Sequence, residues 1–90
     1  MILNKIQLFP IGYSEVVYKN KKYGVTRMDY NNGKSIKLYA RELGGNDFIS
    51  FNYYITANTV RLKPCEMSDE KVQHFLNNYK FLQTWKKQRN

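Results

Sequence analysis

The chain has 90 residues, of which 42% are hydrophobic, 16% aromatic and 24% charged, and its formal net charge is +8. A chain of this length builds one domain with one modest core, which excludes two domains and predicts a single domain over residues 1–90. The single cysteine excludes an internal disulfide and a four-cysteine zinc site, and the single histidine excludes a histidine metal cluster. We expect no metal and no cofactor.

The first ten residues contain short apolar clusters that include Ile2, Ile6 and Leu8. They lack the apolar segment and the small-residue cleavage site of a signal peptide. No part of the chain approaches the roughly 18 apolar residues of a membrane span. We therefore expect a cytoplasmic protein with a reduced cysteine. The apolar residues near the N-terminus would add a strand at a sheet edge or a flap.

Residues 14–63 alternate in polarity and contain a turn signal about every ten residues, which predicts an antiparallel meander of four or five strands. The first strand would run from Glu15 to Lys19 and turn at Asn20-Lys21 into the second. Lysine is an unfavourable residue where a turn requires a positive φ, so this is the weakest of the predicted turns.

The next turn signal is Asn31-Asn32-Gly33. A three-residue loop with glycine in the third position favours a type I turn followed by a G1 bulge. This loop pairs Met28 with Ile36. It places Gly24, Thr26 and Met28 on the apolar face of the second strand.

Two more hairpins extend the meander. A two-residue Gly44-Gly45 loop pairs Leu38 with Phe51, and an Ala57-Asn58 loop pairs Ile55 with Val60. Both registers keep apolar side chains on one face, and a slip by one residue would destroy that pattern.

After Pro64 the apolar period changes from two residues to three or four. Ser68 is a suitable helix N-cap, and Asp69 and Glu70 follow it where the helix dipole favours acids. The apolar stripe of Val72, Phe75, Leu76, Tyr79 and Leu82 predicts an amphipathic helix over about residues 68–86. The predicted fold class is therefore α+β: a meander over about residues 14–63 with one C-terminal helix packed on one face.

The opposite face of this sheet would carry aromatic side chains among cations. The residues that this register assigns to it as binding candidates are Tyr23, Arg27, Lys37, Tyr39, Arg41, Phe48, Tyr54, Arg61 and Lys63. Single-stranded nucleic acid binds to such surfaces because rings stack on bases and cations meet phosphates. Two alternatives remain open. The face could be an ordinary solvated sheet surface, or it could be buried in a homodimer or against another protein.

The C-terminal segment is basic as well. Residues 71–90 carry five of the Lys and Arg residues and no Asp or Glu. Lys86, Lys87 and Arg89 could contact nucleic acid, an anionic membrane surface or an acidic protein, or they could belong to a solvated helix end.

Catalytic candidates are few. Cys65 precedes the predicted helix start, where a thiol pKa can be lowered, and His74 is the only imidazole. A reactive pair would require the two side chains to touch, and Cys65 has no second cysteine to resolve an oxidised intermediate. We assign no catalytic residue.

The stretch from Tyr23 to Leu76, which contains YGVTRMDYNNGKSIKLYARELGGNDFISFNYY and LKPCEMSDEKVQHFL, resembles small uncharacterised bacterial proteins, some of which carry a peptide methionine sulfoxide reductase label. Such reductases place their nucleophilic cysteine in a Gly-Cys-Phe-Trp setting. Cys65 stands in Pro-Cys-Glu-Met, so the resemblance transfers no catalytic residue.

The sequence thus favours a small non-enzymatic binding protein of bacterial type. Single-stranded nucleic acid is the first expected partner, and a protein-interaction or homodimerisation module is the alternative. A Cys65-dependent redox enzyme is the third reading.

Overall fold

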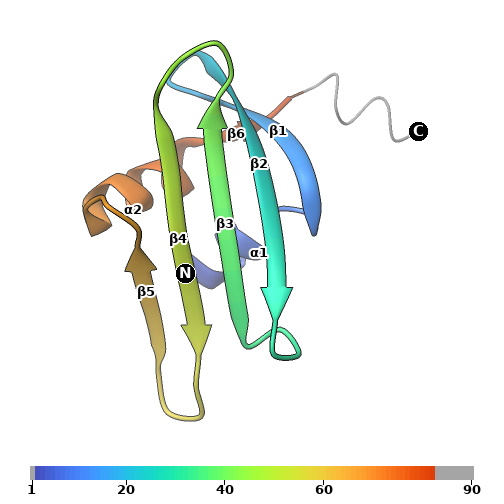
Figure 1. The fold of residues 1–90 in the computed structure, drawn as a ribbon, viewed down its shortest axis with the longest axis vertical. Helices are drawn as coiled ribbons and strands as arrows, with labels where there is room; N and C mark the ends of the chain where they lie inside the picture. Colours follow the sequence, from blue (N-terminus) through green and yellow to red (C-terminus); the bar gives the residue numbers. More distant parts are fainter. Residues whose placement is uncertain (1, 83–90) are drawn as a thin grey trace.

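A six-stranded antiparallel sheet and two helices form the α+β fold in the computed structural model, which describes residues 2–82 (Figure 1). The elements are α1 (Ile2–Gln7), β1 (Gly12–Tyr18), β2 (Lys21–Tyr30), β3 (Ser35–Glu42), β4 (Phe48–Ile55), β5 (Val60–Pro64), α2 (Asp69–Asn78) and β6 (Lys80–Phe81). The strand order in the sheet is β5-β4-β3-β2-β1-β6. The α+β class and the antiparallel meander are confirmed, with one helix and one or two strands more than expected.

Both helices lie on the same side of the sheet, behind it in Figure 1. We call the sheet surface that they cover the inner face and the opposite surface the outer face. The inner face and the helices share one core cluster, whose buried members are Ile6, Phe9, Val16, Tyr18, Tyr23, Val25, Ile36, Leu38, Ala40, Ile49, Phe51, Tyr53, Val72, Phe75 and Leu76. The apolar stripe of α2 therefore packs on the sheet, as its period predicts.

The β3–β4 and β4–β5 hairpins have the predicted registers. Leu38 lies opposite Phe51, and Ile55 lies opposite Val60. The β3–β4 loop is wider than two residues, because Glu42 donates its backbone N–H to the carbonyl of Asp47 and closes the ladder there. The wider loop keeps the register because it is centred on the same Gly44-Gly45 pair.

The register between β2 and β3 differs from the prediction by one residue. Tyr30 lies opposite Ser35 and Arg27 opposite Leu38, so the loop contains four residues instead of three. Asn31 and Asn32 both adopt positive φ angles of 56° and 58°, a conformation that asparagine tolerates. Because side chains alternate along a strand, this slip exchanges the two faces of β2.

The exchange reverses several predictions. Tyr23 and Arg27, expected on the outer face, point inward and are buried, and Val25 between them does the same. Met28, expected in the core, is 41% exposed on the outer face. Tyr23 and Val25 thus occupy the core in place of Gly24, Thr26 and Met28.

Two features at the N-terminal end also differ from expectation. The β1–β2 turn is Lys19-Asn20 with φ angles of 53° and 64°, and β1 runs from Gly12 to Tyr18. The apolar residues near the N-terminus form α1 instead of a strand. Ile2 and Ile6 are four residues apart, the spacing that places both on one helix face, and both contact the core.

Arg27 connects this N-terminal segment to the sheet from inside the fold. Its guanidinium forms two hydrogen bonds with the carboxylate of Asp29, at 2.9 and 2.8 Å, and donates to the carbonyl of Phe9 at 2.7 Å. A longer bond of 3.4 Å reaches the carbonyl of Gln7 at the end of α1. The burial of Arg27 is therefore compensated, and its role is to hold α1 against the sheet.

Helix α2 begins as predicted and ends early. The hydroxyl of Ser68 accepts a hydrogen bond from the N–H of Lys71, which is the N-cap interaction. The helix stops at Asn78, and Lys80 and Phe81 pair with β1 as a short edge strand. The predicted helical segment beyond Asn78 is thus wrong as far as residue 82, and the rest of it lies outside the described residues. Within residues 2–82 no helix is long and apolar enough to cross a membrane.

Candidate functional site

The outer face keeps most of the predicted aromatic and basic residues. Seven of the predicted candidates lie there: Lys37, Tyr39, Arg41, Phe48, Tyr54, Arg61 and Lys63. Tyr23 and Arg27 do not, because the register of β2 turns them into the core. Lys86, Lys87 and Arg89 lie outside the described residues.

The same register brings other residues to this face that sequence reasoning missed. They are Tyr13 on β1 and Lys22, Met28 and Tyr30 on β2. Lys22, Met28 and Tyr30 lie on one face of β2. A sequence prediction that turned this face outward would therefore have included all three. Tyr13 was missed because the first strand was predicted to begin after it.

Cross-strand pairing arranges these side chains in rows that run across the sheet. A central row contains Met28, Lys37, Asn52 and Lys63, which are neighbours on successive strands from β2 to β5. One flanking row contains Tyr13, Thr26, Tyr39 and Ser50, and the other contains Tyr30, Ser35, Tyr54 and Arg61. Tyrosines therefore stand on both sides of the central lysines, about 6.7 Å away along the strands.

The tyrosines of this face are open to solvent. The exposed fractions are 52% for Tyr13, 49% for Tyr30, 39% for Tyr39 and 37% for Tyr54. The rings of Tyr39 and Phe48 lie beside each other with their centroids 6.1 Å apart. Rings held this way on a rigid sheet present their π-faces or edges to a ligand with little loss of conformational entropy.

Charges are sorted between the two sides of the sheet. The strands place Lys22, Lys37, Arg41, Arg61 and Lys63 on the outer face and only one carboxylate, Glu15. Their other carboxylates, Asp29 and Glu42, lie on the inner side and are paired there with Arg27 and Lys21. The outer face is therefore strongly positive.

The one outer carboxylate is itself engaged. The hydroxyl of Tyr13 donates a 2.9 Å hydrogen bond to Oε2 of Glu15. Burial, followed by this hydrogen bond and the charge of Glu15, raises the pKa of Tyr13 above its ordinary value. The Tyr13 ring lies over Gly24, since a Cβ at Gly24 would come within 2.5 Å of the Tyr13 hydroxyl oxygen. Glycine at position 24 thus leaves room for the Tyr13 side chain against the outer face.

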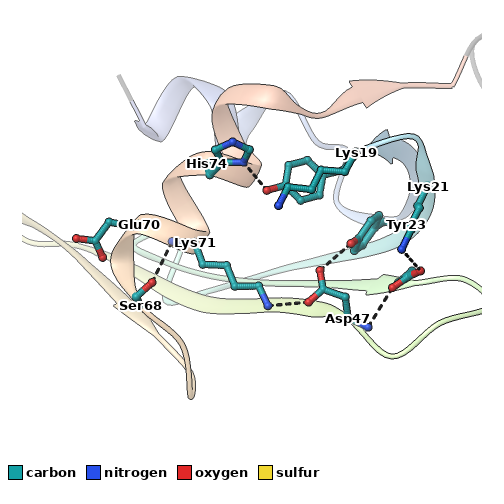
Figure 2. Close-up of a pocket in the computed structure, with 10 residues that line it drawn as sticks. Lys19, Lys21, Tyr23, Asp47, Ser68, Glu70, Lys71 and His74 are labelled. Atoms are coloured by element: carbon teal, nitrogen blue, oxygen red, sulfur yellow. Dashed lines mark hydrogen bonds and ion pairs between the residues drawn. The ribbon is translucent and has the colours of Figure 1, made fainter.

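A second candidate is a cleft of about 620 Å³ at the other side of the sheet, between the β1–β2 turn, the β3–β4 loop and the first turns of α2 (Figure 2). Its polar groups are largely paired with one another. Asp47 accepts a 2.7 Å hydrogen bond from Tyr23 and contacts Lys71 Nζ at 2.6 Å, and Lys21 lies 3.5 Å from Glu42. This pattern ties α2 to the sheet.

The pKa shifts in the cleft agree with this structural role. Burial alone would raise the pKa of Asp47, but the hydrogen bonds from Lys71 and Tyr23 and the charge of Lys71 outweigh it and lower the pKa. Burial and the hydrogen bond to Asp47 raise the pKa of Tyr23. Burial, and then the charge of Asp47, raises the pKa of Tyr18. All three groups are therefore held in their ordinary protonation states at neutral pH.

The cysteine and the histidine have separate surroundings. Cys65 donates its backbone N–H to Ser50, and its sulfur accepts a 3.8 Å contact from the amide of Asn52, beside the outer face. The Nδ1 atom of His74 is 2.5 Å from the hydroxyl of Tyr18, in the cleft. Within residues 2–82 the structure therefore shows no hydrogen bond between Cys65 and His74. It shows no group of three His, Cys, Asp or Glu side chains there that could hold a metal ion.

Comparison with known proteins finds no matching family model, no matching curated protein and no matching solved structure. The case for a function therefore depends on the chemistry of the two surfaces described above.

Proposed function

We propose that the outer face binds single-stranded nucleic acid. The observation that carries this proposal is the sorting of charge. The strands place five cations and four open tyrosines on one side of the sheet, and the single carboxylate there already accepts a hydrogen bond from Tyr13. A solvated sheet surface needs charge for solubility, but it does not need five cations for one carboxylate.

Each component of the face matches one part of a single strand. Unpaired bases stack on exposed rings, and this contributes about 1–3 kcal/mol per base whatever the sequence. Phosphates meet the lysines and arginines and release counterions. The central lysines lie between two rows that contain tyrosines. A single nucleic-acid strand can therefore stack a base and pair a phosphate at neighbouring nucleotides.

The charge of the face also weighs against self-association through it. Two copies packed outer face to outer face would bring the five strand cations of each together with only one carboxylate, Glu15, on each copy, which costs free energy. An acidic protein remains the competing partner, and stacking distinguishes it from nucleic acid. A single nucleic-acid strand offers a base for stacking at every nucleotide, whereas an acidic protein offers a stacking group only where it has a suitable side chain.

Fluorescence anisotropy with a short labelled oligothymidylate at low salt tests the proposal. Tyr39→Ala should weaken binding by about 1–3 kcal/mol at every salt concentration, because stacking releases no counterions. Leu8→Ala is the matched control, since Leu8 is 65% exposed but belongs to the α1 segment on the other side of the sheet. It should leave the affinity unchanged.

The same titration repeated over a range of salt concentrations tests the cations. Lys37→Ala or Lys63→Ala should reduce the slope of log affinity against log salt by up to about 0.7 for each phosphate that is no longer neutralised. Lys5→Ala removes an equal charge from α1 and should leave the slope almost unchanged. An affinity no better than about millimolar, or equal effects of Lys5 and Lys37, would mean unspecific attraction to a basic protein and would refute the proposal.

Cys65 supplies an independent readout because its sulfur contacts Asn52, which lies on the outer face. Saturating oligonucleotide should slow alkylation of Cys65, and Tyr39→Ala should reduce this protection. Sedimentation of the free protein tests the alternative that the outer face forms a homodimer. If the wild type is a dimer that Tyr39→Glu converts to a monomer, the outer face is a self-association surface instead.

A further inference from the structure

Asn52 is the one side-chain amide that the strands place on the outer face within residues 2–82. It stands in the central row between Lys37 on β3 and Lys63 on β5. Tyr54 follows it on the same strand and the same face, two residues or about 6.7 Å away. A base stacked on the Tyr54 ring would therefore bring its edge within reach of the Asn52 amide.

The Asn52 amide retains most of its hydrogen-bonding capacity. Its only hydrogen bond within residues 2–82 is the 3.8 Å contact from Nδ2 to the sulfur of Cys65. A thiol sulfur is a weak acceptor, so this contact can orient the amide at little cost to a stronger partner. The carbonyl oxygen Oδ1 and a second N–H are left for a ligand.

Two cations stand directly beside these two residues on the neighbouring strand. Lys63 is the cross-strand partner of Asn52, and Arg61 is the cross-strand partner of Tyr54. The ring of Tyr54 and the amide of Asn52 lie along β4, and the two positive charges of Arg61 and Lys63 lie opposite them along β5. This is the set of contacts that one nucleotide offers: a base face, a base edge and a phosphate.

We propose that Asn52, Tyr54, Arg61 and Lys63 form a nucleotide subsite that prefers adenine; this inference rests on the proposed function. An amide presents a donor and an acceptor side by side, and adenine presents its N6 amino group beside a ring nitrogen acceptor. Asparagine pairs with adenine through two hydrogen bonds for this reason. Thymine and cytosine also present a donor and an acceptor side by side, but their smaller rings stack less strongly on Tyr54.

The test compares labelled oligonucleotides of equal length made of deoxyadenosine, of thymidine and of deoxypurine riboside, which lacks the N6 amino group. The wild type should bind oligodeoxyadenylate about 5- to 100-fold more tightly than the oligopurine, the range of one bidentate contact. Asn52→Ala should abolish this difference. Asn46→Ala is the matched control, because Asn46 is an exposed amide in the β3–β4 loop, and it should preserve the preference.

The comparison with purine separates hydrogen bonding from stacking, since both purines present similar ring faces. If Asn52→Ala retains the adenine preference, or if the wild type binds all three oligonucleotides equally, the adenine subsite is wrong while nucleic-acid binding stands. If the wild type binds none of them, the proposed function itself fails.

Discussion

Lys71 Nζ, in the first turn of α2, lies 2.6 Å from Oδ1 of Asp47, in the loop between β3 and β4. The other carboxylate oxygen of Asp47 accepts a hydrogen bond from Tyr23 on β2. One carboxylate thus connects the helix to two different parts of the sheet. It does so in the cleft of Figure 2, beside the N-terminal end of the helix.

This arrangement predicts a dependence of stability on acid. The pKa of Asp47 is lower in the folded protein than in the unfolded chain, so ionised Asp47 stabilises the fold above its unfolded pKa of about 4. That contribution is lost as the pH falls through the folded pKa. Asp47→Asn should cost about 1 kcal/mol near neutral pH, since the pair is partly exposed, and progressively less as the pH falls through the folded pKa of Asp47.

Urea unfolding of both proteins across this pH range measures the difference. Lys71→Met should behave as Asp47→Asn does, and the double variant should cost less than the sum of the two. Additive effects would show that the two side chains act separately.

The register of the β3–β4 and β4–β5 hairpins could be predicted because two constraints agreed there. The glycines and the Ala57-Asn58 pair indicated where the chain turns, and the apolar residues of β3 and β4 alternate without ambiguity. Even a wider loop around Gly44 preserved the register because it is symmetric about the same point.

The register of β2 could not be predicted, and that failure explains most errors in the candidate site. Both faces of β2 contain apolar and polar residues, so alternation alone did not choose between them. The loop decided the register, and consecutive asparagines can adopt left-handed conformations that the expected turn does not use. The outer face was therefore predicted correctly on β3, β4 and β5 and incorrectly on β2.

The α1 helix was missed for a different reason. Six residues are too few to show a helical period clearly, and a helix of that length is unstable alone. Its stability comes from contacts with residues distant in sequence, such as the hydrogen bond that Tyr79 donates to the carbonyl of Lys5. Sequence patterns within one segment cannot reveal such contacts.

Leu38 and Phe51 are fully buried opposite each other at the centre of the sheet. Leu38→Ala should cost about 2–5 kcal/mol, because it removes buried methyl groups and leaves a cavity that the sheet cannot close. Tyr39→Ala changes the next residue on the same strand, which points to the outer face. It should cost clearly less in urea unfolding, and a larger cost for Tyr39 would contradict the register of β3.

Alkaline conditions should destabilise the protein through Tyr79. Burial raises the pKa of Tyr79 to about 12, so the folded protein favours the neutral phenol. The resulting stability is present below the unfolded pKa of about 10 and is lost as the pH rises toward 12. Tyr79→Phe should cost about 1 kcal/mol at neutral pH, from the lost hydrogen bond, yet lose less stability than the wild type between about pH 10 and 12. Parallel pH-dependent losses would assign the effect to other groups.

Arg27 and Arg41 offer the most direct comparison of the two sides of the sheet. Arg27 is buried and binds Asp29 and the carbonyl of Phe9, whereas Arg41 is exposed on the outer face. Arg27→Met should cost about 3 kcal/mol, because it leaves the Asp29 carboxylate and a buried carbonyl without their partner. Arg41→Met should cost less than about 0.5 kcal/mol, as surface substitutions usually do.

Oligonucleotide binding by the two variants should show the reverse order. Arg41→Met should reduce the slope of log affinity against log salt, while folded Arg27→Met should bind as the wild type does, because its guanidinium has no access to the outer face. Circular dichroism before each titration confirms that Arg27→Met is folded under the conditions used. A large loss of stability from Arg41→Met together with a small loss from Arg27→Met would mean that the faces of β2 and β3 have been assigned the wrong way round, and the proposed binding surface would be lost with them.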